Sequence, residues 1–188
     1  MNLSVSAFLM AGIIVLAQAF TLASAGEGES PPAYGVEAPL MTDKTFRTPL
    51  PKPYDDARDA TKDIETALSE AKQDEKFVLV TFGANWCPDC RALAAMMQMP
   101  EFQKFMQDHF VQVYVDVGRY DRNLDVAEAI GVTDGKGVPT VVVLTSSGKM
   151  LNKATSSAWI TSQGRDPQAA LNYFATYAPI KDGDVPLN

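Results

Sequence analysis

Histidine and cysteine are scarce in this sequence, and clusters of basic residues are absent from it. The 188 residues include one His and two Cys, too few for a structural zinc site with a full tetrahedral set of such ligands. The formal net charge is −7, and no run of Lys or Arg stands out. Because nucleic-acid binding draws most of its affinity from clustered basic side chains, we expect no nucleic-acid partner. With 46% hydrophobic residues, the chain can still form a globular core.

Charge is also missing from the first 25 residues of the chain. An apolar run over about residues 7–20 leads into TLASA at residues 21–25, a small-x-small pattern typical of a signal-peptide cleavage site. The run is shorter than the roughly 20 residues that a membrane-spanning helix needs. We therefore predict a signal peptide at residues 1–25 and export to the periplasm. Because no Lys or Arg precedes the apolar run, an uncleaved membrane anchor remains an alternative.

Proline sets the next segment apart from the rest of the chain. Residues 26–54 are rich in proline, which fits neither a helix interior nor a central strand, so we predict an extended arm or linker there. Residues 55–180 are predicted to form one α/β domain, and residues 181–188 a C-terminal tail.

Hydrophobic periodicity predicts alternating helices and strands within residues 55–180. Apolar residues spaced by three and four indicate helices, whereas continuous or alternating β-branched runs indicate strands. The predicted helices cover residues 55–76, 87–97, 101–110, 124–130 and 166–177, and the predicted strands cover residues 77–82, 111–117, 138–145 and an antiparallel strand from Met150. This order predicts a mixed central β-sheet flanked by helices on both faces.

The two cysteines are three residues apart, in the sequence Cys87-Pro88-Asp89-Cys90, between a predicted strand and a predicted helix. Pro88 suits the first turn of a helix, where its missing N–H costs nothing. Cys87 then lies at the positive end of the helix dipole, which favours its thiolate. Residues at i and i+3 of a helix face the same way, so Cys90 can attack a mixed disulfide on Cys87. We predict that Cys87 is the exposed nucleophile and Cys90 the resolving cysteine.

Other interpretations of the cysteine pair involve no catalysis. A purely structural disulfide is disfavoured, because the stabilisation grows with loop length and this loop is very short. Two thiolates suit two-coordinate Cu(I), and Met96, Met97 and Met99 lie at and just beyond the end of the predicted active-site helix. Methionine more often fills gaps in a core, so we expect these three to be core residues and predict no metal site. His109 shares a face with Phe102, Phe105 and Met106, so we expect it at the core and assign it no role.

The segment FGANWCPDCR at residues 82–91 resembles the active-site segment of the thioredoxin superfamily, with Trp86 before the first cysteine and Arg91 after the second. GVPT at residues 137–140 resembles the superfamily loop that carries a cis proline beside the active-site disulfide. The resemblance implies a thioredoxin-like fold. It also implies that Pro139 is cis and that the backbone of Val138 pairs with a substrate peptide. Trp86 is expected to shield the site and contact substrate. Arg91 is expected to support the thiolate, with a solvated surface charge as the alternative.

Two positions depart from thioredoxin itself. Thr81 stands where thioredoxins carry a buried Asp, and Ala95 where they carry a helix-kinking Pro. These departures favour a narrower, exported relative over a general thioredoxin. Strong oxidants in the superfamily often have a His between the cysteines, whereas this chain has Asp89, whose charge opposes a neighbouring thiolate. We therefore expect behaviour closer to that of a reductant.

These observations predict an exported thiol–disulfide oxidoreductase that reduces or exchanges disulfides in client proteins. It would need an upstream thiol electron donor, expected in the membrane. No nucleotide or phosphate loop is recognisable, so we expect no organic cofactor beyond the Cys87–Cys90 disulfide. Two alternatives remain open: a disulfide oxidase or isomerase, and a non-enzymatic module that holds a client or Cu(I).

Overall fold

The sheet at the centre of the fold has three strands in the order β2-β1-β3. β1 is Phe77–Gly83, β2 is Phe110–Asp116 and β3 is Thr140–Leu144. β1 pairs in parallel with β2 and antiparallel with β3, so the predicted mixed sheet is confirmed. The computed structural model describes residues 33–46, 48–133 and 135–187, and the predicted signal peptide at residues 1–25 lies outside them.

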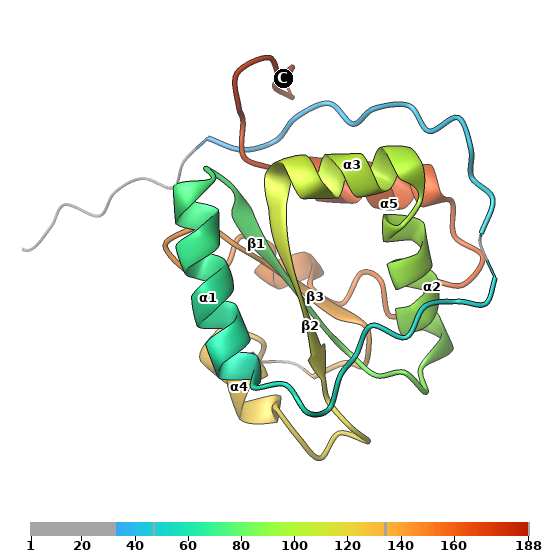
Figure 1. Ribbon diagram of the computed structural model, residues 1–188, viewed down its shortest axis with the longest axis vertical. Coiled ribbons are helices and arrows are strands. Elements are labelled where there is room, and N and C mark those ends of the chain that lie inside the picture. Colours follow the sequence, from blue (N-terminus) through green and yellow to red (C-terminus); the bar gives the residue numbers. More distant parts are fainter. Residues whose placement is uncertain (1–32, 47, 134, 188) are drawn as a thin grey trace, which may run out of the picture. The chain divides into compact units, whose positions relative to one another are not determined.

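Helices cover both faces of this sheet, as predicted (Figure 1). α1 (Ala60–Gln73) and α4 (Leu124–Ala129) pack with one face of the strands. α2 (Pro88–Met97), α3 (Pro100–His109) and α5 (Pro167–Ala175) pack with the other. All seven residues of β1 are buried because its neighbours cover both of its faces. The carboxyl end of this central strand leads directly to the cysteine pair.

Capping residues determine where the first and last helices begin. α1 begins at Ala60, five residues after the predicted start, because Asp59 has extended backbone angles and accepts a hydrogen bond from the backbone N–H of Lys62. Asp166 caps α5 in the same way, accepting from the N–H of Gln168, and this predicted N-cap is confirmed.

The predicted strand from Met150 is wrong. The structure has only an isolated bridge there, between Leu144 and Met150. The side chain of Asn152 takes the place of a neighbouring strand: its Oδ1 accepts from the N–H of Val143 and its Nδ2 donates to the carbonyl of Val141, both at 2.8 Å. With these β3 groups already bonded, the chain turns into a short 3-10 helix, Lys153–Thr155, instead of continuing as a strand.

The described part of the proline-rich arm lies against the domain. Val36 is buried, and isolated bridges join Tyr34 to Pro179 and Val36 to Pro186, so the arm and the C-terminal tail contact each other. Figure 1 shows the arm continuing past α3 and α2 before it joins α1. The domain boundaries at residues 54 and 181 stay predictions. Within the described residues, no helix is both long and apolar enough to cross a bilayer.

Candidate active site

The two cysteines form a disulfide at the start of α2, with their Cα atoms 5.3 Å apart. Cys87 is the N-cap of this helix and Pro88 is its first residue, as predicted from the sequence. The backbone N–H of Cys90 donates to Sγ of Cys87 at 3.1 Å. A thiolate on Cys87 would therefore have both a direct donor and the positive end of the helix dipole beside it.

Both sulfur-bearing residues are more covered than a reactive pair at a surface would be. Cys87 is 4% exposed and Cys90 is 0% exposed. Cys87 is the more exposed of the two, as expected, but it is still a buried residue. The cover comes from Tyr54 and Val138, which pack against the pair. Sequence periodicity within the domain could not show this, because Tyr54 belongs to the proline-rich arm.

The loop before β3 lies directly beside the disulfide. The Val138–Pro139 peptide bond is cis, which confirms the expectation for Pro139. Sγ of Cys87 is 3.7 Å from the carbonyl oxygen of Val138, the residue expected to pair with substrate. Gly137 has φ +139°, a conformation that favours glycine, and its carbonyl accepts from Oγ1 of Thr140 at 2.6 Å. This bond holds the loop at the start of the strand.

Trp86 lies at the rim of the site. Its side chain is 46% exposed, and its Nε1 donates to the carbonyl oxygen of Gly118 at 2.6 Å. The ring of Tyr120, which is also exposed, is 6.0 Å from the indole, and the guanidinium of Arg119 is 5.9 Å from it. One hydrogen bond thus fixes the orientation of the partly exposed indole.

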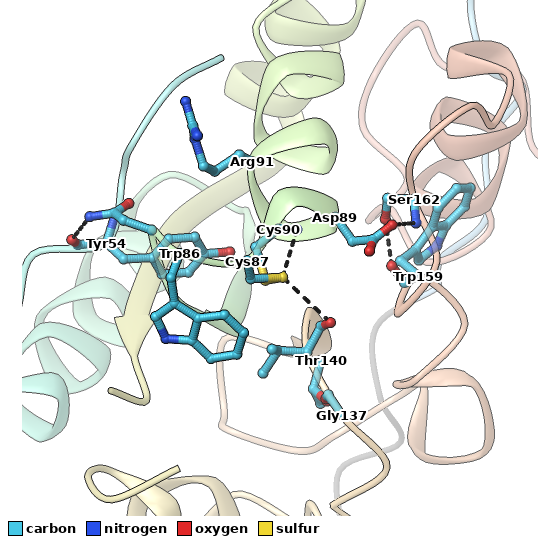
Figure 2. The surroundings of a disulfide bond; sticks show 12 residues. Tyr54, Trp86, Cys87, Asp89, Cys90, Arg91, Gly137, Thr140, Trp159 and Ser162 are labelled. Atoms are coloured by element: carbon cyan, nitrogen blue, oxygen red, sulfur yellow. Dashed lines mark hydrogen bonds between the residues drawn. A yellow bond between two sulfur atoms is a disulfide. The ribbon is translucent and has the colours of Figure 1, made fainter. Parts of the chain in front are cut away.

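Asp89 contacts the segment that follows β3. Its Oδ1 accepts from the backbone N–H groups of Ser162 at 2.7 Å and Gln163 at 2.9 Å, and Figure 2 shows the carboxylate directed toward Ser162. These donors partly offset the opposition of the carboxylate to a thiolate on Cys87. They also attach this segment to the active-site helix. Trp159, which lies in the same segment, is 1% exposed and belongs to the core.

Arg91 and Asn85 hold the arm beside the disulfide. The guanidinium of Arg91 donates to the carbonyls of Leu50 at 2.7 Å and Pro51 at 3.0 Å. Asn85 bonds both backbone groups of Tyr54, accepting from its N–H at 3.2 Å and donating to its carbonyl at 2.5 Å. Figure 2 shows Arg91 pointing away from the sulfurs, so its partners are carbonyls of the arm and not the thiolate to which the sequence analysis assigned it.

Tyr54 is the residue at this site that the sequence analysis missed. Its side chain is 3% exposed, and its ring meets that of Tyr114 edge-on at 5.5 Å. Burial raises the pKa of Tyr54 well above its ordinary value, so its hydroxyl stays protonated. No local signal marked it, because an aromatic residue in a proline-rich segment has no periodicity that indicates burial.

The remaining candidate ligands lie in the core. Met96, Met97 and Met99 are buried in the cluster formed by α2, α3 and α5, which confirms that they are core residues. His109 is also buried, as expected, with Nδ1 3.2 Å from the carbonyl oxygen of Pro179. The described residues contain no group of three or more His, Cys, Asp or Glu that could hold a metal ion.

The chain is similar to known proteins. A family model for thioredoxin-like proteins matches residues 59–146. A solved disulphide isomerase from Xylella fastidiosa Temecula1 is 36% identical with a TM-score of 0.63, and the match covers 67% of this chain and 96% of that one. Thioredoxin H4 of Arabidopsis thaliana is 31% identical over 94 residues, which are 50% of this chain and 71% of that protein. The chain belongs to the thioredoxin superfamily.

Membership in this superfamily, together with the Cys87–Cys90 disulfide, makes the protein a thiol–disulfide oxidoreductase. The matched residues 59–146 include both cysteines and the cis-proline loop. They exclude residues 33–54, the part of the arm that brings Tyr54 to the site. The contacts of the arm with Asn85 and Arg91 are therefore a feature that the family match does not describe.

Proposed function

We propose that this thioredoxin-superfamily protein is an exported enzyme that reduces or exchanges disulfides in client proteins through Cys87 and Cys90. One observation carries the proposal: the disulfide caps α2 and lies beside the cis Val138–Pro139 bond, with Sγ of Cys87 3.7 Å from the Val138 carbonyl. This geometry supports a site in which a reactive sulfur and a strand-like docking edge for a peptide are adjacent.

In the proposed cycle, the Cys87 thiolate attacks a client disulfide and forms a mixed disulfide, releasing one client sulfur as a thiolate. Cys90 then attacks Sγ of Cys87, which re-forms the Cys87–Cys90 disulfide and releases the second client sulfur. The client gains two electrons and the enzyme loses two. The client backbone pairs with Val138 during this exchange, and Trp86 contacts the client from the rim.

Exchange, as well as net reduction, fits this site. The similarity to a protein described as a disulphide isomerase supports exchange, in which the client itself resolves the mixed disulfide. Net reduction requires that a thiol donor restores the dithiol after each turnover, and we propose a membrane-bound donor. The cycle needs no organic cofactor, because the cysteine pair carries the electrons.

The proposed location is outside the cytoplasm. The uncharged leader at residues 1–25 and its small-x-small ending support export to the periplasm. Client proteins in such a compartment contain disulfides that benefit from reduction or exchange.

Cysteine variants test this proposal in a thiol-release assay with a disulfide-bonded protein as substrate. We expect Cys87→Ser to abolish release, because the nucleophile is gone. Cys90→Ser should instead accumulate a mixed disulfide between Cys87 and the substrate, visible on a non-reducing gel. A Cys87→Ser variant with full activity would contradict the proposal. The reduction potential then gives the direction: a value near about −270 mV indicates a reductant, and one near about −120 mV an oxidant.

A further inference from the structure

A buried hydroxyl beside the disulfide has no hydrogen-bond partner. Oη of Tyr54 is one of three buried side-chain polar atoms without a partner among the described residues. Buried polar groups are nearly always hydrogen-bonded, so each exception calls for an explanation. Figure 2 shows the Tyr54 ring extending from the arm with its hydroxyl end next to Cys90, and the two residues pack in one cluster with Cys87.

The neighbouring sulfur atoms can become negatively charged when the disulfide opens. In the disulfide neither sulfur is charged, whereas the resolving step needs Cys90 as a thiolate. Cys90 is 0% exposed, so water cannot solvate that charge. The Cys87 sulfur already has a donor in the N–H of Cys90. A buried donor without a partner therefore lies beside a buried sulfur that needs one during the reaction.

We propose that the hydroxyl of Tyr54 donates a hydrogen bond to the Cys90 thiolate in the mixed-disulfide state and thereby speeds the resolving step. The inference rests on the function proposed above. Tyr54 stabilises the attacking thiolate in this scheme: it forms no covalent bond to the client and keeps its proton throughout. The Cys90 thiolate attacks Sγ of Cys87, the sulfur–sulfur bond to the client breaks, and the client thiolate takes a proton from water.

Four contacts place the hydroxyl at the pair. Asn85 holds the Tyr54 backbone by two hydrogen bonds, and Arg91 holds the carbonyls of Leu50 and Pro51 just before it. Asn85 lies two residues before Cys87, and Arg91 lies one residue after Cys90. The residues that hold the arm therefore flank the cysteine pair in the sequence. The absence of a side chain at Gly83 leaves room for the phenol, since a Cβ there would lie 2.5 Å from Oη.

The other titratable groups around the cysteine pair do not supply this hydrogen bond. Tyr114 of β2 packs against Tyr54, but its own hydroxyl donates to Sδ of Met97 at 3.6 Å. Asp116 of β2 cannot donate this hydrogen bond, because a carboxylate only accepts. Burial of Tyr54 and the charge of Asp116 both favour the protonated form of Tyr54. On α2, Asp89 accepts from the N–H groups of Ser162 and Gln163.

The test follows the lifetime of the mixed disulfide in rapid-quench experiments, with a disulfide-bonded peptide as the client and the full mature chain as the enzyme. We expect Tyr54→Phe to lengthen this lifetime about tenfold, because hydrogen bonds to charged groups are among the stronger ones. We also expect the pH profile of resolution to move to higher pH, since the thiolate forms less readily. The first attack by Cys87 should keep its rate.

Tyr114→Phe is the matched control, because it removes a neighbouring hydroxyl that is bonded elsewhere, and it should leave the pH profile unchanged. Tyr54→Phe with wild-type lifetime and profile would overturn the inference. If neither variant nor the wild type forms a mixed disulfide, the proposed function fails instead. Should Tyr54→Phe not fold, 3-fluorotyrosine at position 54 keeps the shape with a stronger donor. It should then shorten the lifetime, and an unchanged lifetime overturns the inference.

Discussion

The last residue of β1 has no side chain, and the Tyr54 ring fills the space that a side chain would need. A Cβ on Gly83 would lie 2.5 Å from Cζ and Oη of Tyr54, much closer than atoms approach without a shift. Both residues are buried, so little room exists for an adjustment. We expect Gly83→Ala to lower the free energy of unfolding by about 1–3 kcal/mol, the usual cost of overpacking, measured by denaturant titration.

A second substitution separates this clash from a general effect of alanine. In the Tyr54→Ala background, Gly83→Ala should cost much less, because the ring that it meets is gone, and the two changes should be non-additive. Gly135→Ala is the control, since no atom lies within 4 Å of a Cβ at that position. Equal costs of Gly83→Ala in both backgrounds would show that the ring is not the obstacle.

The residues predicted from the sequence are those whose roles follow from a local motif. Cys87, Pro88 and Cys90 lie as predicted because a helix start determines their geometry. Tyr54 and the partners of Arg91 could not be predicted, because their contacts join the motif to a segment more than thirty residues earlier. Only the folded arm brings these residues together, and no spacing within one element encodes that contact.

At the scale of elements, the proline-rich arm depends on side chains of the active-site segment. Arg91 bonds two carbonyls of the arm, and the arm has few backbone donors of its own because proline lacks an N–H. We expect Arg91→Ala to weaken docking of residues 50–54 by about 1–3 kcal/mol, the range for hydrogen bonds to a charged group. The backbone N–H of Tyr54, which donates to Asn85, should then exchange with solvent about tenfold faster or more in hydrogen-exchange measurements.

Arg58→Ala provides the comparison for this prediction. Arg58 pairs with Asp63 at the exposed surface of α1, and such pairs contribute little to stability. Its removal should leave the exchange of the Tyr54 N–H close to that of the wild type. If Arg91→Ala also leaves that exchange unchanged, the arm is held by contacts other than these two hydrogen bonds.

Most elements were predictable because their hydrophobic pattern and their end signals agree. The buried run of β1 and the N-cap of α5 are examples. The strand expected from Met150 was wrong because a single side chain, Asn152, provides the hydrogen bonds that a neighbouring strand would have provided. Periodicity indicates which face of a segment is apolar. It does not indicate that a side chain will make the hydrogen bonds that the backbone of a neighbouring strand would otherwise make.

At the scale of the whole molecule, the one histidine makes stability depend on pH. Burial lowers the pKa of His109 below its ordinary value, and this effect outweighs the Asp184 carboxylate, whose Oδ1 is 3.8 Å from Nε2. The unfolded chain therefore binds a proton more readily than the folded one. Stability is greatest above the unfolded-state pKa of about 6.5 and falls as the pH drops through that value toward the lower folded-state pKa.

Replacement of His109 isolates this contribution. We expect His109→Asn, which cannot be protonated in this range, to reduce the slope of unfolding free energy against pH between about pH 7 and pH 5. One proton limits the slope to about 1.4 kcal/mol per pH unit. Denaturant titrations at several pH values measure it. An identical slope in the variant would assign the pH dependence to the carboxylates.

The shared space of Gly83 and Tyr54 also has an evolutionary consequence. Where a homologue keeps the arm, an aromatic residue at the position of Tyr54 should occur with glycine at that of Gly83, because the ring leaves no room for a side chain there. A homologue that lacks the arm is free to fill the same volume with a larger side chain on the strand itself. Covariation of these two positions, visible in an alignment of relatives, would therefore record the gain or loss of the arm within the lineage.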